Sequence, residues 1–197
     1  MLKITWFIIT LIFTSVITTV VYHKTQKADI YYYQGHRLFE KSAYDKATKF
    51  YEQALKIKPS YADALEDLAY CYQWTDRYEK AIEVFQKALL SSPQDNGLKI
   101  SLAETYSWIK EYKKAIPLYK EVIAVTDSLD TKMQLAEVYI WNNQFEEAKE
   151  ILFEILKITP EDKKVKLLLA RAMQYSGQAK QAIEIYKELL GEVNGNE

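Results

Sequence analysis

Glycine, proline and cysteine are scarce in this sequence. Its 197 residues include only 5 Gly, 4 Pro and 1 Cys. Few turn-forming residues argue against a protein built of many short β-strands. The lone Cys71 excludes a disulfide framework within the chain and a zinc site built from several cysteines. The formal net charge is -1, so the chain as a whole lacks a basic field, and we expect no nucleic-acid partner.

Catalytic motifs are missing as well. The two histidines are His23 and His36, and no cysteine–histidine pair, glycine-rich phosphate loop or set of paired metal ligands is found. Acidic residues are numerous, but they occur in segments such as YEKAIE and FEEAKE, which are typical of solvated helix faces. We therefore predict a protein that is not an enzyme and that needs neither a cofactor nor a metal.

The N-terminal part of the chain contains a long uncharged segment. Residues 4–22 carry no charge, and a helix of that length spans about 28 Å at ~1.5 Å per residue, close to the apolar thickness of a bilayer. We predict a transmembrane helix that contacts the lipid bilayer through residues 4–22. A cleaved signal peptide is the alternative, but the segment is long for one and has no Ala-x-Ala cleavage site.

The charges that flank this segment set its expected orientation only weakly. Lys3 precedes it, and His23, Lys24 and Lys27 follow it against Asp29. We predict a single-pass membrane protein whose remaining domain lies outside the cytoplasm, on the periplasmic side, with a cytoplasmic domain as the alternative. Because no Pro or Gly occurs between residues 24 and 34, the helix is expected to continue into the next one.

The rest of the chain repeats itself with a fixed period. Alanine recurs at residues 47, 81, 115, 148 and 182, at spacings of 34, 34, 33 and 34. A small residue lies twelve positions before each of these alanines, and an aromatic residue lies three positions before four of them. A proline lies twelve positions after three of them: Pro59, Pro93 and Pro160.

This pattern resembles the tetratricopeptide repeat, a helix–turn–helix unit of about 34 residues. The resemblance implies an all-α fold, a right-handed α-solenoid of five units preceded by the transmembrane helix. The units start near residues 28, 62, 96, 129 and 163. The expected domains are an anchor with its juxtamembrane segment at 1–27, the solenoid at 28–191 and a flexible tail at 192–197. No single unit can bury its own apolar face, so stability comes from stacked neighbours.

The resemblance also implies a concave groove lined by the first helix of each unit. Groove side chains in this family include positions 5, 9 and 13 of the repeat, and position 13 here holds an aromatic ring in four repeats. Either these rings contact a ligand, or they only close the first helix against its neighbour. The candidate groove residues are Tyr32, His36, Tyr70, Trp74, Glu104, Trp108, Glu137, Trp141, Arg171 and Tyr175.

A second candidate surface lies at the C-terminal end. The residues after Leu190 are too few for a capping helix, although terminal repeats normally need a polar outer face. Part of the apolar set Ile183, Tyr186 and Leu190 would otherwise lie under a further helix. We expect these residues to contact a partner or a second copy of the chain, with a modest exposed patch as the alternative.

Segments such as LAETYSWIKEYKKAI are similar to tetratricopeptide segments of bacterial exopolysaccharide-export and outer-membrane assembly proteins. We therefore predict a membrane-anchored adaptor of bacterial type, which binds a partner protein through its groove and supports assembly of a membrane-associated complex. Subunits of a membrane complex are the expected partners. The alternative is a module that contacts a glycan within an exopolysaccharide-export or envelope-assembly system.

Overall fold

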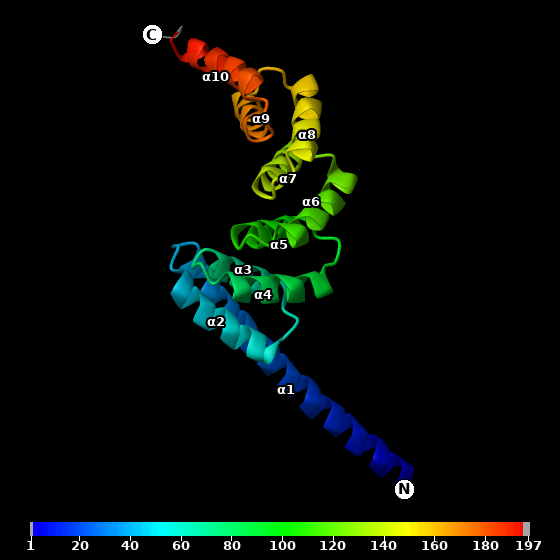
Figure 1. Cartoon of the computed structure of the whole chain (residues 1–197). Helices are drawn as coiled ribbons and strands as arrows, with labels where there is room; N and C mark the ends of the chain where they lie inside the picture. Colours follow the sequence, from blue (N-terminus) through cyan, green and yellow to red (C-terminus); the bar gives the residue numbers. More distant parts are fainter. Residues whose placement is uncertain (1, 195–197) are drawn as a thin grey trace. The chain divides into compact units, whose positions relative to one another are not determined.

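A computed structural model gives the fold of the chain and describes the backbone of residues 2–194, with the side chains of residue 6 and residues 10–191. Across residues 2–194 the regular structure consists of ten α-helices joined by short connections (Figure 1). This confirms the all-α prediction. The helices are α1 (Leu2–Phe39), α2 (Tyr44–Ile57), α3 (Ala62–Gln73), α4 (Tyr78–Ser91), α5 (Asn96–Trp108), α6 (Tyr112–Thr126), α7 (Leu129–Trp141), α8 (Phe145–Ile158), α9 (Lys163–Tyr175) and α10 (Ala179–Asn194).

Consecutive helices pack as pairs, and the pairs stack within two compact units, Met1–Gln94 and Asp95–Glu197. In the first unit α1 packs on α2 and α3 on α4, and α2 also contacts α3. In the second unit the pairs are α5 with α6, α7 with α8 and α9 with α10, and α6 and α8 each contact the next pair. The five helical pairs agree with the predicted number of repeat units.

Helix ends follow from local chemistry. Pro59, Pro93 and Pro160 each lie two residues beyond the end of α2, α4 and α8, because proline lacks the amide hydrogen that would continue the helix. In the third repeat Asp127 takes the proline's place and turns the chain with a φ of 49° after α6. Side chains of Asp95, Ser128 and Asp162 accept backbone amides at the starts of α5, α7 and α9.

Small residues lie where the two helices of a pair cross. The recurring alanines of the second helices are at most 1% exposed, as are the alanines twelve positions before them. Without larger side chains at these points, the helix backbones approach closely, and the large residue four positions further along fills the space beside them. Those large residues, Tyr51, Phe85, Tyr119 and Leu152, are at most 2% exposed.

Lysine occupies position 4 of the three repeats in the second unit, where the first two repeats have Tyr31 and Leu65. The Lys99 ammonium lies 3.1 Å from a carboxylate oxygen of Glu121, and that of Lys166 lies 2.7 Å from Glu188. Each ion pair joins the first helix of a repeat to the second helix of the same repeat. The lysine stems lie along the packed surface while the ammonium groups keep charged partners.

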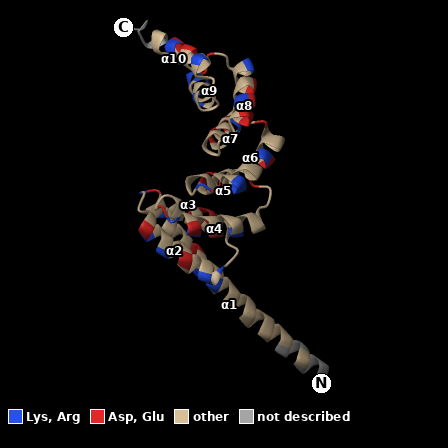
Figure 2. Cartoon of the chain, viewed as in Figure 1, with Lys and Arg blue, Asp and Glu red and all other residues tan. Residues whose placement is uncertain are grey.

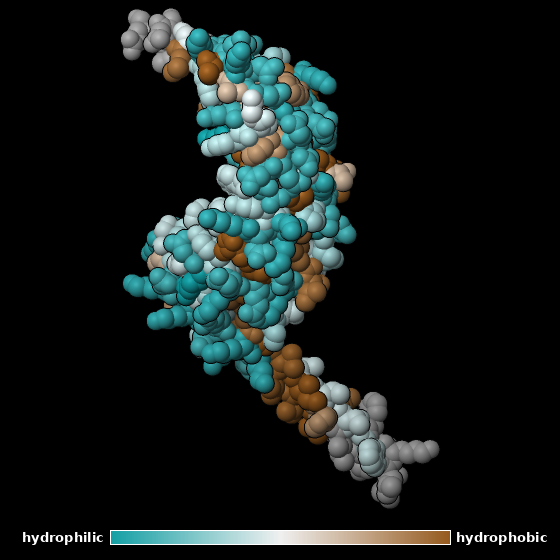
Figure 3. Space-filling model, viewed as in Figure 1, coloured by the Kyte–Doolittle hydropathy of each residue, from teal (hydrophilic) through white to brown (hydrophobic). Residues whose placement is uncertain are grey.

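The first part of α1 projects beyond α2 (Figure 1), and its described side chains from Leu11 to Tyr22 are exposed. This stretch has an apolar surface (Figure 3) and no charged side chain (Figure 2), whereas charges of both signs are scattered over the later helices. Hydroxyl groups interrupt the apolar run, and those of Thr14, Thr18 and Thr19 donate to backbone carbonyls of the same helix.

Among the described residues, none of the helices is at once long enough and apolar enough to span a membrane. This finding contradicts the predicted transmembrane helix and bilayer contact of residues 4–22. The predicted single-pass location, with the repeat domain on the periplasmic side, rested on that helix and is contradicted with it. The prediction rested on the whole uncharged segment, whereas the continuous part of it whose side chains are described, residues 10–22, is shorter than a membrane span and is followed by Lys24 and Lys27. The side chains of residues 4, 5 and 7–9 of this segment lie outside the described residues.

At the other end of the chain, α10 continues to Asn194. Residues 192–194 of the predicted flexible tail therefore extend a helix, and residues 195–197 lie outside the described residues.

Gly35 provides a test of close packing within the first pair. A Cβ added there would lie 2.8 Å from Cε1 of Tyr51, whose ring is fully buried and whose hydroxyl donates to Asp67 at 2.8 Å. We expect Gly35→Ala to lower the free energy of unfolding by about 1–3 kcal/mol, because the ring cannot move without losing that bond. Urea unfolding followed by circular dichroism measures the change.

Gly191→Ala is the matched control for Gly35→Ala. A Cβ at Gly191, in α10, would meet nothing within 4 Å, so only the higher helix propensity of alanine remains. We expect this control to unfold at the same or a higher urea concentration. A Gly35→Ala protein as stable as the control would contradict the packing argument.

Candidate ligand-binding surface

The predicted groove residues lie on the first helices of the pairs. In the first unit Tyr32 and His36 are on α1, and Tyr70 and Trp74 lie on α3 or at its end. In the second unit, α5, α7 and α9 carry the residues that follow the same spacing: Glu104, Trp108, Glu137, Trp141, Arg171 and Tyr175. The two units are described separately below.

In the first unit, Tyr32 and His36 belong to a packed polar cluster. The Nδ1 atom of His36 lies 3.0 Å from Oδ2 of Asp67, and the Tyr51 hydroxyl donates to the same oxygen at 2.8 Å. The Tyr32 ring stacks on His36 with centroids 5.6 Å apart. Asp67 comes from α3, so this cluster joins the first repeat to the second.

Burial and the Asp67 carboxylate both disfavour ionisation of the phenols in this cluster. Burial is the larger cause for Tyr32, with the Asp67 charge next, and together they raise its pKa to about 12. Burial and the hydrogen bond to Asp67 also raise the pKa of Tyr51. Both hydroxyls therefore remain protonated donors at neutral pH. Tyr32 and His36 are thus held by contacts between helices, and ligand contact by either stays a prediction.

The aromatic residues at position 13 pack in a recurring way. Trp74 lies 6.4 Å from Tyr44, Trp141 lies 6.4 Å from Tyr112, and Tyr175 lies 5.8 Å from Phe145, measured between ring centroids. In each case the ring at the end of a first helix packs against the aromatic residue that begins the second helix of the preceding repeat. The position-13 ring is therefore a contact between neighbouring repeats.

A large part of each of these rings is nevertheless exposed to solvent. Trp74 and Tyr175 are 60% and 61% exposed, and Trp108 and Trp141 are each 44% exposed. Rings of this size with so much surface in solvent are effective contacts for a ligand, because they present area with few rotatable bonds. The two interpretations of the sequence are therefore compatible: one part of each ring meets the preceding repeat, and the rest faces outward.

In the second unit, four predicted groove residues line one pocket. Trp108 and Glu104 come from α5, and Trp141 and Glu137 come from α7. The pocket has a volume of about 110 Å³. Its remaining lining residues are Ser107, Tyr119, Gln134 and Val138.

The two carboxylates dominate the electrostatics of this pocket. Burial raises the pKa of Glu104, although a hydrogen bond from the Gln134 amide, 2.8 Å long, works in the opposite direction. Burial, and then the charges of Glu104 and Glu137, raise the pKa of Tyr119. No lysine or arginine lines the pocket. Its lining therefore combines two indole rings with two carboxyl groups.

The remaining predicted residues do not gather at one place. Tyr70 packs edge-on against Phe85 with centroids 5.4 Å apart, and Arg171 is exposed on α9. At the C-terminal end Ile183 and Leu190 are exposed, while the Tyr186 hydroxyl donates to the Gln174 side chain at 3.1 Å. That this end binds a partner or a second copy stays a prediction.

Sequence reasoning missed the polar residues at position 6. Asp67 and Gln134 occupy this position, and each bonds to the position-9 residue of the preceding repeat, His36 or Glu104. A polar residue at position 6, paired with position 9 of the repeat before it, would have been the signal. It is easily passed over because the two residues are about 30 apart in sequence and differ in type between repeats.

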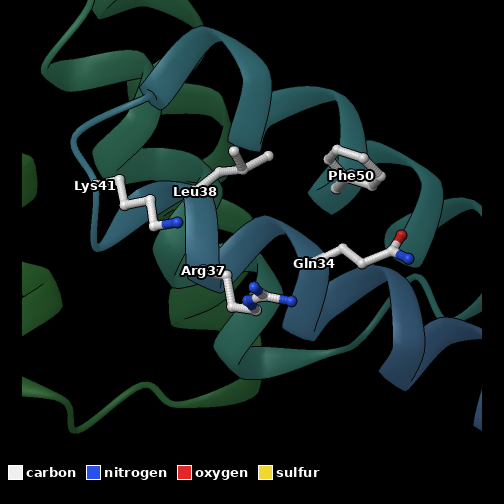
Figure 4. Close-up of a pocket in the computed structure, with 5 residues that line it drawn as sticks. All are labelled: Gln34, Arg37, Leu38, Lys41 and Phe50. Atoms are coloured by element: carbon white, nitrogen blue, oxygen red, sulfur yellow. The ribbon is translucent and has the colours of Figure 1, made fainter.

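Sequence reasoning also missed a pocket on the first helical pair. It has a volume of about 260 Å³ and lies between α1 and α2. Gln34 and Arg37 line it from α1 and Lys41 from the turn after α1, and Leu38 points toward Phe50 of α2 (Figure 4). Its α1 residues lie at repeat positions 7, 10 and 11 and not at the groove positions 5, 9 and 13.

Several solved structures share this fold. A crystal structure of MamA aligns with a TM-score of 0.76 at 22% identity, over 84% of this chain and 91% of that one. MamA from Desulfovibrio magneticus RS-1 aligns with a TM-score of 0.77 at 19% identity, over 86% and 96%. YrrB, described as a TPR protein with an unusual peptide-binding site, aligns with a TM-score of 0.74 at 18% identity, over 88% and 90%.

At these identities the alignments establish the fold alone. A search for relatives among curated proteins gives no match. The family model for the tetratricopeptide repeat, however, matches residues 38–104 and 110–172, well over half of the chain. With the helical pairs and their recurring alanines, this match shows that the chain belongs to the tetratricopeptide-repeat family.

Proposed function

We propose that this protein is an adaptor without catalytic activity, which binds a segment of a partner protein along its first helices and so supports assembly of a complex. The repeat scaffold suits protein–protein interaction, and the YrrB structure described above is of a TPR protein with a peptide-binding site. The observation that carries the proposal is the recurring, half-exposed aromatic ring at the end of each first helix from α3 to α9.

Packing against the preceding repeat makes these rings good anchors for a ligand. A side chain that is already held loses little conformational entropy when a partner binds to it. Trp141 is held by Tyr112, and its pocket neighbour Trp108 lies at the equivalent place one repeat earlier. An extended peptide that crosses α5 and α7 would meet both indole rings and the pocket between them. The second unit is therefore where we place the main contact.

The test is to replace the two indoles that line the pocket. Full-length protein is probed on an array of random 15-residue peptides, and the affinities of the selected peptides are then measured by fluorescence anisotropy. We expect Trp108→Ala with Trp141→Ala to weaken binding by about 2 kcal/mol or more, roughly 30-fold in Kd, as for aromatic hot spots elsewhere.

Phe153→Ala is the matched control, because Phe153 is 46% exposed but lies on α8, a second helix. Circular dichroism establishes that each variant remains folded. The proposal fails if the array selects no peptide, or if the folded tryptophan variant binds the selected peptides as well as the Phe153 variant does. An oligosaccharide array run in parallel tests the glycan alternative: loss of oligosaccharide binding with unchanged peptide binding would favour it.

A further inference from the structure

The pocket between α5, α6 and α7 differs from the rest of the second unit in how its charges are matched. Elsewhere in that unit, partly buried lysines have partners of opposite sign. Lys99 pairs with Glu121, Lys149 with Glu146 and Lys166 with both Glu161 and Glu188, at distances from 2.7 to 3.1 Å. In the pocket, two carboxylates at equivalent repeat positions face a space without a lysine or arginine on its walls.

Glu104 has a neutral partner. Burial raises the pKa of the carboxyl because it disfavours the charged form, and the Gln134 amide, which donates to its Oε1, acts in the opposite direction. Glu137 makes no hydrogen bond or ion pair with the residues that the structure describes. Burial raises the pKa of Tyr119, and the charges of Glu104 and Glu137 raise it further. The pocket thus holds negative charge that the protein leaves without a cation.

The walls of the pocket favour the same kind of ligand. Trp108 and Trp141 are indoles, and the face of an indole ring attracts a cation more strongly than that of any other side chain. Guanidinium in particular stacks on aromatic faces and donates in a fork to carboxylates. The volume of about 110 Å³ equals that of three to four water molecules at ~30 Å³ each, enough for the end of one long side chain.

We propose that this pocket binds the cationic end of an arginine or lysine side chain in the partner segment, held between the indoles of Trp108 and Trp141 and against the carboxylates of Glu104 and Glu137. The inference rests on the proposed function, because it names the chemistry of the residue that the adaptor recognises. The partner segment is therefore expected to contain a basic residue within a stretch of extended backbone. Arginine is the better fit, because it satisfies two carboxylates and a flat ring together.

The experiment compares a charged probe with its neutral isostere. The probes are acetyl-Gly-Arg-Gly-Leu-Arg-Gly-amide and the same peptide with citrulline in place of both arginines, titrated into the full-length protein in 150 mM salt. Tryptophan fluorescence measures binding, and the NMR signals of the Trp108 and Trp141 indole groups locate it. We expect the arginine peptide to bind at least tenfold more tightly than the citrulline peptide. Peptides selected on the array are tested with the same replacement.

Two variants with equal net charge locate the effect. Glu104→Gln with Glu137→Gln removes both pocket carboxylates, and we expect it to abolish the preference for arginine. Glu150→Gln with Glu154→Gln removes two exposed carboxylates of α8, so the preference should remain. If the array peptides bind but the replacement by citrulline changes nothing, the cation inference is overturned and the adaptor function stands. If the array selects no peptide at all, the adaptor function itself fails.

Lowering the pH provides an independent readout. The titratable groups that face the pocket are Glu104 on α5, Tyr119 on α6 and Glu137 on α7. The carboxyls attract a cation only above their pKa, and that of Glu104 is raised from the usual 4.5. We therefore expect affinity for the arginine peptide to fall with decreasing pH, beginning at a higher pH than an ordinary glutamate would give. Citrulline binding should stay constant, and an arginine affinity equally flat with pH would contradict the role of Glu104.

Discussion

Close contact between helix backbones at small residues is the interaction on which the rest of this structure depends. The alanines at the helix crossings are almost completely buried, and the large side chains beside them fill the space that the crossings leave. Each pair, once formed, still presents apolar side chains outward and must be covered by the next pair. The stacking of pairs within each unit follows from this need, and with it the positions of the side chains on the first helices.

The residues that join one repeat to the next also shape the surface available to a partner. Position-13 rings meet the aromatic residue of the preceding repeat, and position-6 side chains bond to position 9. In the second unit this arrangement leaves a pocket between two indoles and two carboxylates. The side chains that hold neighbouring repeats together therefore also form the surface proposed to bind a partner. A substitution at such a place affects stability and binding together, which is why matched controls on the second helices are informative.

Much of the fold could be predicted from sequence because its signals are local and repeated. The alanine period and the prolines beyond α2, α4 and α8 indicate where helices cross and where they end. Less of the candidate site could be predicted from the sequence. That Glu104 and Glu137 lie on equivalent faces follows from the period, but the bond of Glu104 to Gln134 depends on a residue 30 positions away, whose type differs from its counterpart Asp67. The transmembrane prediction is contradicted because, among the described residues, no helix is long and apolar enough to span a membrane.

One further consequence concerns the length of α1. It runs from Leu2 to Phe39 without a break, so its 38 residues form a rod of about 57 Å at ~1.5 Å per residue. Its last three turns, from the fully buried Ala28 to Phe39, pack on α2 and on the cluster around Asp67, and its first part projects beyond α2. In a continuous helix of this kind, the first repeat fixes both the direction of the far end and the way its side chains face. Because successive helical residues are rotated by ~100°, the insertion of a single residue would turn that end to face elsewhere, even though every repeat remained intact.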